Sequence, residues 1–409
     1  MEPWEKIYIR LRTGQTIPDI DPHLQIACVD CHGGNASQPN NKEAAHTGLI
    51  ADPSEYRIID GQRTNSCAGA NCHESLVKDQ YGKSLHQNLW GEKVMVAARS
   101  GVQSFDQCPQ TTIEGYNGEC ASCHATCGDC HIAIPNSAGS GFPKTGPIYS
   151  SHKFYKTPDM QNNCTACHGS RVAHDFYGEE GVRPGDVHYE NNMTCLECHT
   201  QAEMHGAIAE TDQNSISRYH YDQLPACQDC HSGITDANLF HSYHIDDMTC
   251  YVCHSQTTYN NCTACHVDNV WQTDPVYQNN NPVEDFRIGL NPLYSTFEQG
   301  DLRKVKFATL RHIPIAPDSY ANWGAASASL PGYNTVPTWK YTSPHNIRRY
   351  NDLTEGVSLP DCYSKCHISA NSANKNYYLF KSYVDSFWSN ESDANTPVFV
   401  DGHLPDGWE

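Results

Sequence analysis

Apolar positions along this chain are scattered, and only short segments show a regular pattern. Val305–Leu310 alternates apolar and polar residues, which is typical of a β-strand. Leu76, Val77 and Leu85 have the spacing of a short helix. Prolines cut the rest of residues 267–361 into short pieces, and no apolar run reaches the roughly 18 residues of a membrane-spanning helix. We therefore expect sparse secondary structure, with short helices, many loops and a small β-containing insertion.

The composition is too polar for conventional apolar cores in a chain of 409 residues, because only 38% of the residues are hydrophobic. The chain instead carries 21 Cys and 23 His beside only 27 Lys and Arg. Its net charge of -20 argues against a nucleic-acid binder, which needs a basic surface. The first residues form neither a basic nor an apolar region, so we expect any signal peptide to be absent from this chain.

The cysteines follow one pattern. Twenty of the 21 form ten pairs, and a His directly follows the second Cys of every pair. The spacing C-x-x-C-H is the attachment signature of c-type haem, in which two thiols bind one porphyrin and the adjacent imidazole reaches the iron. Eight pairs have two intervening residues, one has four and one has three. The motifs are Cys28, Cys31, His32; Cys67, Cys72, His73; Cys120, Cys123, His124; Cys127, Cys130, His131; Cys164, Cys167, His168; Cys195, Cys198, His199; Cys227, Cys230, His231; Cys250, Cys253, His254; Cys262, Cys265, His266; and Cys362, Cys366, His367.

Zinc sites and disulfides are the alternative interpretations of paired cysteines. Structural zinc needs two such half-sites for each ion and gives no reason for a His after every pair. A disulfide framework predicts no His pattern at all. The sequence therefore predicts ten covalently bound haems c, which would supply the interior that the aliphatic residues do not. The remaining thiol, Cys108, is expected to be a buried or inert side chain, with an intermolecular or regulatory role as the alternative.

Thirteen His lie outside the motifs, which is enough to give each of ten irons a second, distal imidazole. Iron with His on both faces has no open position for a substrate and can only exchange electrons. His174 and His403 are the expected non-ligands, and His23 competes with His220 for the tenth place. Met193 and Met248 suit packing on a porphyrin edge better than ligation. The predicted distal ligands are His46, His86, His152, His188, His205, His220, His241, His244, His312 and His345.

The motifs are unevenly distributed along the chain. Residues 1–270 hold nine of them, and 362–409 holds the tenth together with an expected C-terminal cap. Residues 271–361 form the expected β-containing insertion, which would donate His312 and His345. With one predicted haem for about 41 residues (409/10), the chain is too short to separate the porphyrins from one another.

Several segments resemble extracellular multihaem c-type cytochromes of metal-reducing prokaryotes, some of which polymerise into filaments. The resemblance implies axial ligation by His188, His205, His241, His244, His312 and His345. It departs from the usual pattern at the longer gaps of two motifs and at Cys108. The segments that carry it are Gly118–His131, Asn163–Val172, Asp186–His188, Met204–Gly206, His241–His254, Arg311–Ile315 and Ser343–Ile347.

These features together predict an exported electron carrier rather than an enzyme. The expected role is long-range extracellular electron transfer, with the chain as a subunit of a polymeric cytochrome filament that delivers electrons to acceptors such as Fe(III) oxides. The expected partners are copies of itself, redox proteins or metal oxides. Two alternatives remain: a discrete periplasmic or outer-membrane conduit, and an oxyanion reductase with one open haem site.

Overall fold

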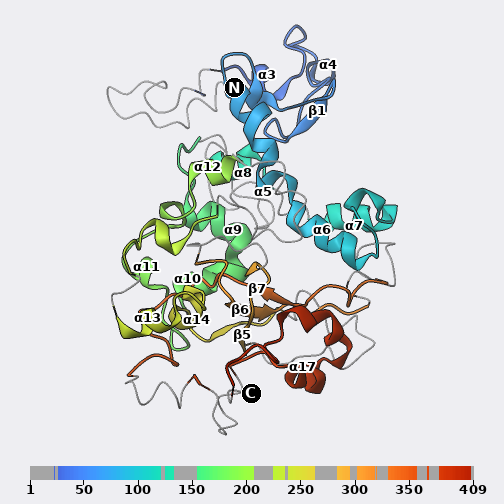
Figure 1. The fold of residues 1–409 in the computed structure, drawn as a ribbon. Coiled ribbons are helices and arrows are strands. Elements are labelled where there is room, and N and C mark those ends of the chain that lie inside the picture. Colours follow the sequence, from blue (N-terminus) through green and yellow to red (C-terminus); the bar gives the residue numbers. More distant parts are fainter. Residues whose placement is uncertain are drawn as a thin grey trace. The chain divides into compact units, whose positions relative to one another are not determined.

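The computed structural model describes residues 23, 26–120, 125–132, 154–206, 224–234, 238–262, 283–294, 302–317, 319, 330–356, 366–367 and 377–406. The chain folds into two compact units, each assembled from separate stretches of sequence (Figure 1). Unit 1 comprises Met1–Leu89, Ala121–Gly169 and His199–Gln213. Unit 2 comprises Trp90–Cys120, Ser170–Cys198 and Asn214–Glu409.

Unit 1 consists of very short helices and one small hairpin. The motif helix at Cys127–His131 begins at a Cys because the preceding residue caps it: Thr126 Oγ1 accepts a hydrogen bond from the Asp129 amide, and the Asp129 carboxylate accepts one from the Thr126 amide. The elements are α3 (Cys28–His32), α4 (Lys42–Ala45), β1 (Arg57–Ile59), β2 (Gln62–Thr64), η2 (Ser66–Ala68), η3 (Leu76–Gln80), η4 (Tyr81–Lys83), α5 (Leu85–Asn88), α8 (Cys127–His131), η9 (Met160–Cys164), α9 (Thr165–His168) and α12 (Gln201–His205).

Unit 2 combines more short helices with the larger sheet. One helix, η10 (Gly169–Ala173), crosses the sequence boundary between the units. The helices of unit 2 are α6 (Trp90–Arg99), η5 (Phe105–Gln107), α7 (Gln110–Glu119), α10 (His174–Tyr177), α11 (Val187–Glu190), η11 (Cys195–Glu197), η14 (Cys227–Asp229), α13 (Leu239–His244), α14 (Cys250–His254), α17 (Lys381–Phe387), η18 (Ser389–Glu391) and η19 (Asp393–Val398). The strands are β3 (Thr258–Asn260), β4 (Val283–Asp285), β5 (Arg287–Leu290), β6 (Phe307–His312) and β7 (Trp339–Tyr341).

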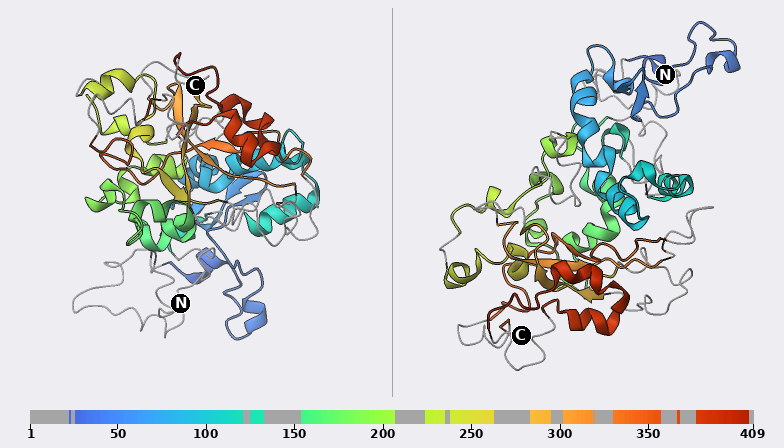
Figure 2. Two further views of the ribbon diagram at one scale, coloured as in Figure 1. Left: turned by 90° about the horizontal axis from the view of Figure 1, so that it is seen from below. Right: turned by 45° about the vertical axis from the view of Figure 1, so that its right-hand side comes forward.

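The apolar core of unit 2 lies on the antiparallel sheet β5-β6-β7, with α17 beside it (Figure 2). Leu310 and Trp339 from the sheet pack against Val384 of α17 and Val398 of η19. Gly289 allows this close packing, because a Cβ there would lie 2.2 Å from a methyl carbon of Leu310. Aliphatic and aromatic side chains thus form a conventional core where the sequence is poorest in Cys motifs.

The expected local elements can be compared with the observed ones, and the compact units differ from the expected division of the chain. The strand expected at Val305–Leu310 forms two residues further along, as β6 (Phe307–His312), and several motifs lie on short helices. The region 271–361 is not a separate insertion, because its sheet packs with the C-terminal segment and belongs to the same unit as α6 and α7. The backbone of Tyr377 and Leu379 hydrogen-bonds to Ile288 of β5, so this aromatic segment extends the sheet. Among the described residues, no helix is long and apolar enough to cross a membrane.

Candidate functional site

Six motif histidines each face a histidine from outside the motifs. The distance between the two ring centroids is nearly the same in all six pairs, from 6.0 to 6.2 Å. The pairs are His73 with His23 (6.2 Å), His168 with His86 (6.1 Å), His131 with His205 (6.1 Å), His231 with His188 (6.1 Å), His254 with His241 (6.1 Å) and His367 with His244 (6.0 Å).

This constant separation fits a metal ion held between two imidazoles. A metal–nitrogen bond of about 2 Å on each side, plus the distance from each nitrogen to its ring centre, places the centroids about 6 Å apart. Ordinary aromatic packing varies more widely, over about 4.5–7 Å. The planes of the six pairs cross at angles from 28° to 81°, yet the separation does not change with the angle. The residues present therefore fit a haem iron with two axial imidazoles.

Hydrogen bonds at Nδ1 orient these rings and leave Nε2 available. The Nδ1 atom of His131 lies 2.7 Å from the Tyr155 carbonyl oxygen, and that of His241 lies 3.0 Å from the Ile234 carbonyl oxygen. His32, His244 and His254 make equivalent contacts with the carbonyls of Ile50, Phe240 and Arg349. A carbonyl at Nδ1 selects the tautomer whose Nε2 has a free lone pair, which is the usual second-shell arrangement of metal-binding His.

Two imidazoles have carboxylate partners instead. The Nδ1 atom of His188 lies 2.8 Å from Asp186 Oδ1, and that of His199 lies 3.0 Å from both oxygens of Glu203. Both carboxylate side chains are almost fully buried. Burial disfavours protonation of His199, but the hydrogen bond and charge of Glu203 outweigh it, so the pKa of His199 is raised. These two imidazoles are therefore stronger electron donors than those bound to carbonyls.

Thiols of different motifs in unit 1 lie close together. The Cys67 and Cys127 thiols share a hydrogen bond, which together with burial raises the pKa of Cys67. The charge of the Cys31 thiolate also raises the pKa of Cys67. Burial raises the pKa of Cys130 to about 12, with contributions from Cys164. Sites 28–32, 67–73, 127–131 and 164–168 are thus neighbours in this order.

The same proximity continues through unit 2. The charge of Cys164 contributes to the raised pKa of His199, and both residues belong to unit 1. The motif of His199 crosses the sequence boundary between the units, and in unit 2 the charge of Cys230 contributes to the raised pKa of Cys198. A hydrogen bond joins the Cys227 and Cys250 thiols and lowers the pKa of Cys227 to about 7. Burial raises the pKa of Cys253 to about 12, with a further contribution from Cys366. The adjacent sites here are 195–199, 227–231, 250–254 and 362–367.

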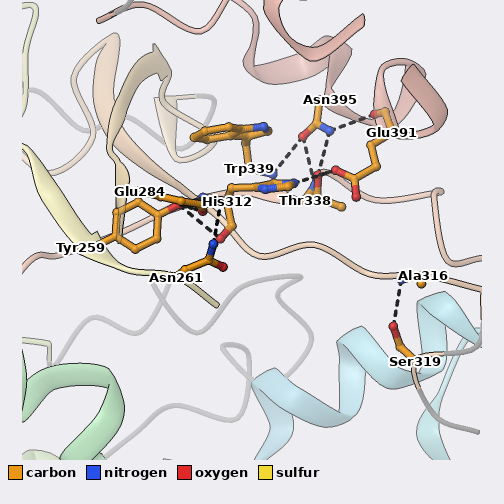
Figure 3. A network of polar contacts seen from close by, with 10 residues as sticks. All are labelled: Tyr259, Asn261, Glu284, His312, Ala316, Ser319, Thr338, Trp339, Glu391 and Asn395. Carbon is orange, nitrogen blue, oxygen red and sulfur yellow. Dashed lines mark hydrogen bonds and ion pairs between the residues drawn. The ribbon is translucent and has the colours of Figure 1, made fainter. Parts of the chain in front are cut away.

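His312 has a different environment from the paired histidines (Figure 3). Its Nε2 atom, the nitrogen that a metal would take, lies 2.8 Å from Glu391 Oε2. Its ring stacks on Trp339 with the centroids 5.0 Å apart, and its amide donates to Tyr259 Oη. The side chain is 1% exposed. The expected ligand role of His312 is therefore replaced by a structural one, in which the residue joins β6 to η18.

The other candidate ligands are placed as follows. His23, which was ranked behind His220 from the sequence, pairs with His73. The sequence signal that could have favoured it is its position five residues before Cys28, similar to the positions of His188, His220 and His244 before their motifs. His46 is exposed at the end of α4, and His345 is half-buried. His174 and His403, the expected non-ligands, are exposed. Cys123, His124, His152, His220, Cys265, His266 and Cys362 lie outside the described residues, as does the side chain of Cys28.

Comparison with protein-family models, with curated proteins and with solved structures finds no match to this chain. The features that point to a function are thus the Cys–His motifs and the geometry of the imidazole pairs.

Proposed function

We propose that this chain is an electron carrier with ten covalently attached haems c, each held between two imidazoles. The observation that carries the proposal is the constant centroid separation of 6.0–6.2 Å in six pairs, each of which joins one motif His to one other His. When bound, such haems take up and release single electrons and pass them to their neighbours.

The residues of the chain have three tasks in this proposal. The paired thiols would attach the tetrapyrrole, the two imidazoles would bind its iron, and partners at Nδ1 orient several of the rings, those of His131, His188, His241, His244 and His254. With two imidazoles, each of the six sites would leave a bound iron no open coordination position. This arrangement favours a carrier over an oxyanion reductase, which needs one open site.

The close thiols of successive motifs support transfer between neighbouring sites. Among the described motifs, these contacts support the order 28–32, 67–73, 127–131, 164–168, 195–199, 227–231, 250–254 and 362–367. In this order the last motif of the sequence neighbours 250–254. A series of neighbouring sites is what a long-range electron carrier requires.

The location and partners belong to the same proposal. Covalent attachment takes place outside the cytoplasm, so the protein is exported, and the negative charge of -20 favours cationic partners or metal ions. In its fuller form, the chain is the subunit of an extracellular filament that reduces acceptors such as Fe(III) oxides, with copies of itself and redox proteins as partners.

The test combines a haem count, a spin state and a microscopic image. Purified native protein should contain ten haems per chain by pyridine haemochrome and intact mass, and its electron paramagnetic resonance (EPR) spectrum should be low-spin. A haem-free chain, or a chain with zinc in the motifs, would overturn the proposal. A stoichiometric high-spin haem in the native protein would favour the reductase instead. Electron microscopy of the extracellular fraction separates a filament, with one chain per repeat, from a discrete conduit.

A further inference from the structure

Two cationic side chains, Arg99 and Lys340, interact in unit 2, and neither has an acidic partner among the described residues. Arg99 ends α6 and is 4% exposed, and no described residue forms a hydrogen bond with its Nε or Nη2 atom. Lys340, in the middle of β7, is partly buried, and its Nζ atom lies 3.4 Å from Met95 Sδ. A thioether sulfur is a weak acceptor and carries no charge. Within the described part of the chain, neither cation forms an ion pair with a carboxylate.

This arrangement is unfavourable for the protein alone. Burying a guanidinium without partners for its N–H groups costs free energy, and a second cation nearby adds repulsion. Burial and the Arg99 charge lower the pKa of Lys340 to about 7. An anion between the two side chains would remove both costs, because its oxygens accept from the guanidinium and the ammonium.

The surrounding structure holds the site firmly. The Gly332 amide donates to the Arg99 carbonyl at 2.9 Å, and a Cβ at Gly332 would lie 2.4 Å from the Ala98 carbonyl oxygen. The loop is thus pressed against the end of α6. Tyr116 of α7 donates to Glu92 of α6 and packs edge-on against Phe105, so α7 is fixed to the same helix.

Expected haem-binding residues lie close in the fold or in the sequence to α6 and β7, which carry the two cations. Cys120 is the C-cap of α7, which packs on α6 (Figure 1). His345 follows Lys340 in the segment that continues from β7. A haem held by Cys120 or by His345 would therefore lie on an element next to one that carries Arg99 or Lys340, and its carboxylates are the groups that these cations could bind.

We propose that Arg99 and Lys340 form a binding site for a propionate carboxylate of one covalently attached haem. The inference rests on the proposed function, which supplies the tetrapyrrole. The guanidinium matches a carboxylate with two parallel N–H donors, and the ammonium neutralises it as a point charge. The pair acts on the cofactor through charge and position and takes no part in axial ligation.

The experiment uses the full haem-loaded chain with Arg99→Gln and Lys340→Met. Lys340→Arg retains the charge, and Lys306→Met removes a lysine from the same region whose Nζ makes an exposed contact with the His403 carbonyl. Each variant is examined by haem count, by spectroelectrochemical titration and by redox difference infrared spectra of the carboxylate bands. A propionate without its cations stabilises the ferric iron. We therefore expect both neutralising variants to keep ten haems, with one component at lower potential and an altered carboxylate band.

Several outcomes would overturn the inference. One is a Lys340→Met protein whose reduction potentials and carboxylate bands equal those of the wild type. If Arg99→Gln does not fold, Lys340→Met alone decides between the two outcomes. Another is that added inorganic phosphate stabilises the wild type but neither Arg99→Gln nor Lys340→Met. That result would identify a free anion as the occupant of the site. A change of equal size in Lys306→Met would show a general charge effect. Failure of the proposed function is seen separately, as a wild-type chain without haem.

Discussion

The imidazoles of His86 and His168 face each other with ring centroids 6.1 Å apart, although His86 follows the motif of His73 and not that of His168. His86 is partly buried, and desolvation lowers its pKa. A neutral imidazole is the form that binds a metal. The fold, and not the nearest motif in the sequence, therefore decides which motif histidine His86 faces.

Substitution of His86 should open one axial position. In His86→Ala we expect all ten haems to remain attached, because the two thiols and His168 are unchanged. About one haem in ten should convert from low-spin to high-spin, as measured by EPR and by the visible spectrum. His174→Ala is the matched control, since His174 is exposed and is an expected non-ligand. A fully low-spin His86→Ala protein would contradict the pairing.

Removal of the carboxylate at His199 should raise a reduction potential. Glu203 accepts from Nδ1 of His199 with both oxygens at 3.0 Å, which strengthens the imidazole as a donor and favours ferric iron. Glu203→Gln should therefore raise the potential of one haem by on the order of 50 mV, because a tenfold change in relative affinity corresponds to about 59 mV for one electron. Redox titration measures this shift.

The control for that variant is Glu197→Gln in the same motif. Glu197 is exposed and bonds to Thr194, so its loss removes one negative charge without changing an imidazole contact. The control should leave the titration nearly unchanged. Equal shifts in the two variants would show that the effect comes from net charge alone.

Substitution of His312 should affect stability and leave the haems unchanged. In His312→Ala the buried Glu391 carboxylate loses its imidazole partner and keeps Thr338 Oγ1. We expect a loss of about 2–4 kcal/mol in the free energy of unfolding, measured by denaturant titration, since one side of a buried charged hydrogen bond is removed. All haems should remain low-spin. A new high-spin signal would instead restore His312 as an axial ligand.

Cys108 should be the single free thiol of the mature protein. It is buried, as expected from the sequence, and burial raises its pKa. A thiol reagent should therefore modify no residue in the folded chain and one per chain after unfolding, while Cys108→Ala should show none.

The pH dependence of stability has a definite sign for this thiol. Its folded pKa lies above the unfolded value, for which the reference is 9.0, so the unfolded chain loses the proton first as the pH rises. The contribution of Cys108 to stability is therefore present below about pH 9 and decreases above it. Unfolding measurements from pH 7 to 10 on the wild type and Cys108→Ala should diverge in that direction. Parallel curves would contradict it.

Local features were predictable because they depend on adjacent residues. A motif such as Cys127–His131 carries the haem c attachment signature within five residues, and its short capped helix forms from the same segment. The strand Phe307–His312 follows from local alternation of side chains. Even the burial of Cys108 follows from the ordinary behaviour of an isolated thiol.

The sequence by itself thus determines the number and type of the expected cofactors and their proximal ligands. Only the tertiary structure decides that His23 faces His73, that His205 faces His131, and that His312 binds Glu391 instead of facing a motif histidine. The physical reason is range. Thiol attachment is local chemistry along the backbone, whereas an axial pair forms only where the folded chain brings two distant imidazoles to the same point.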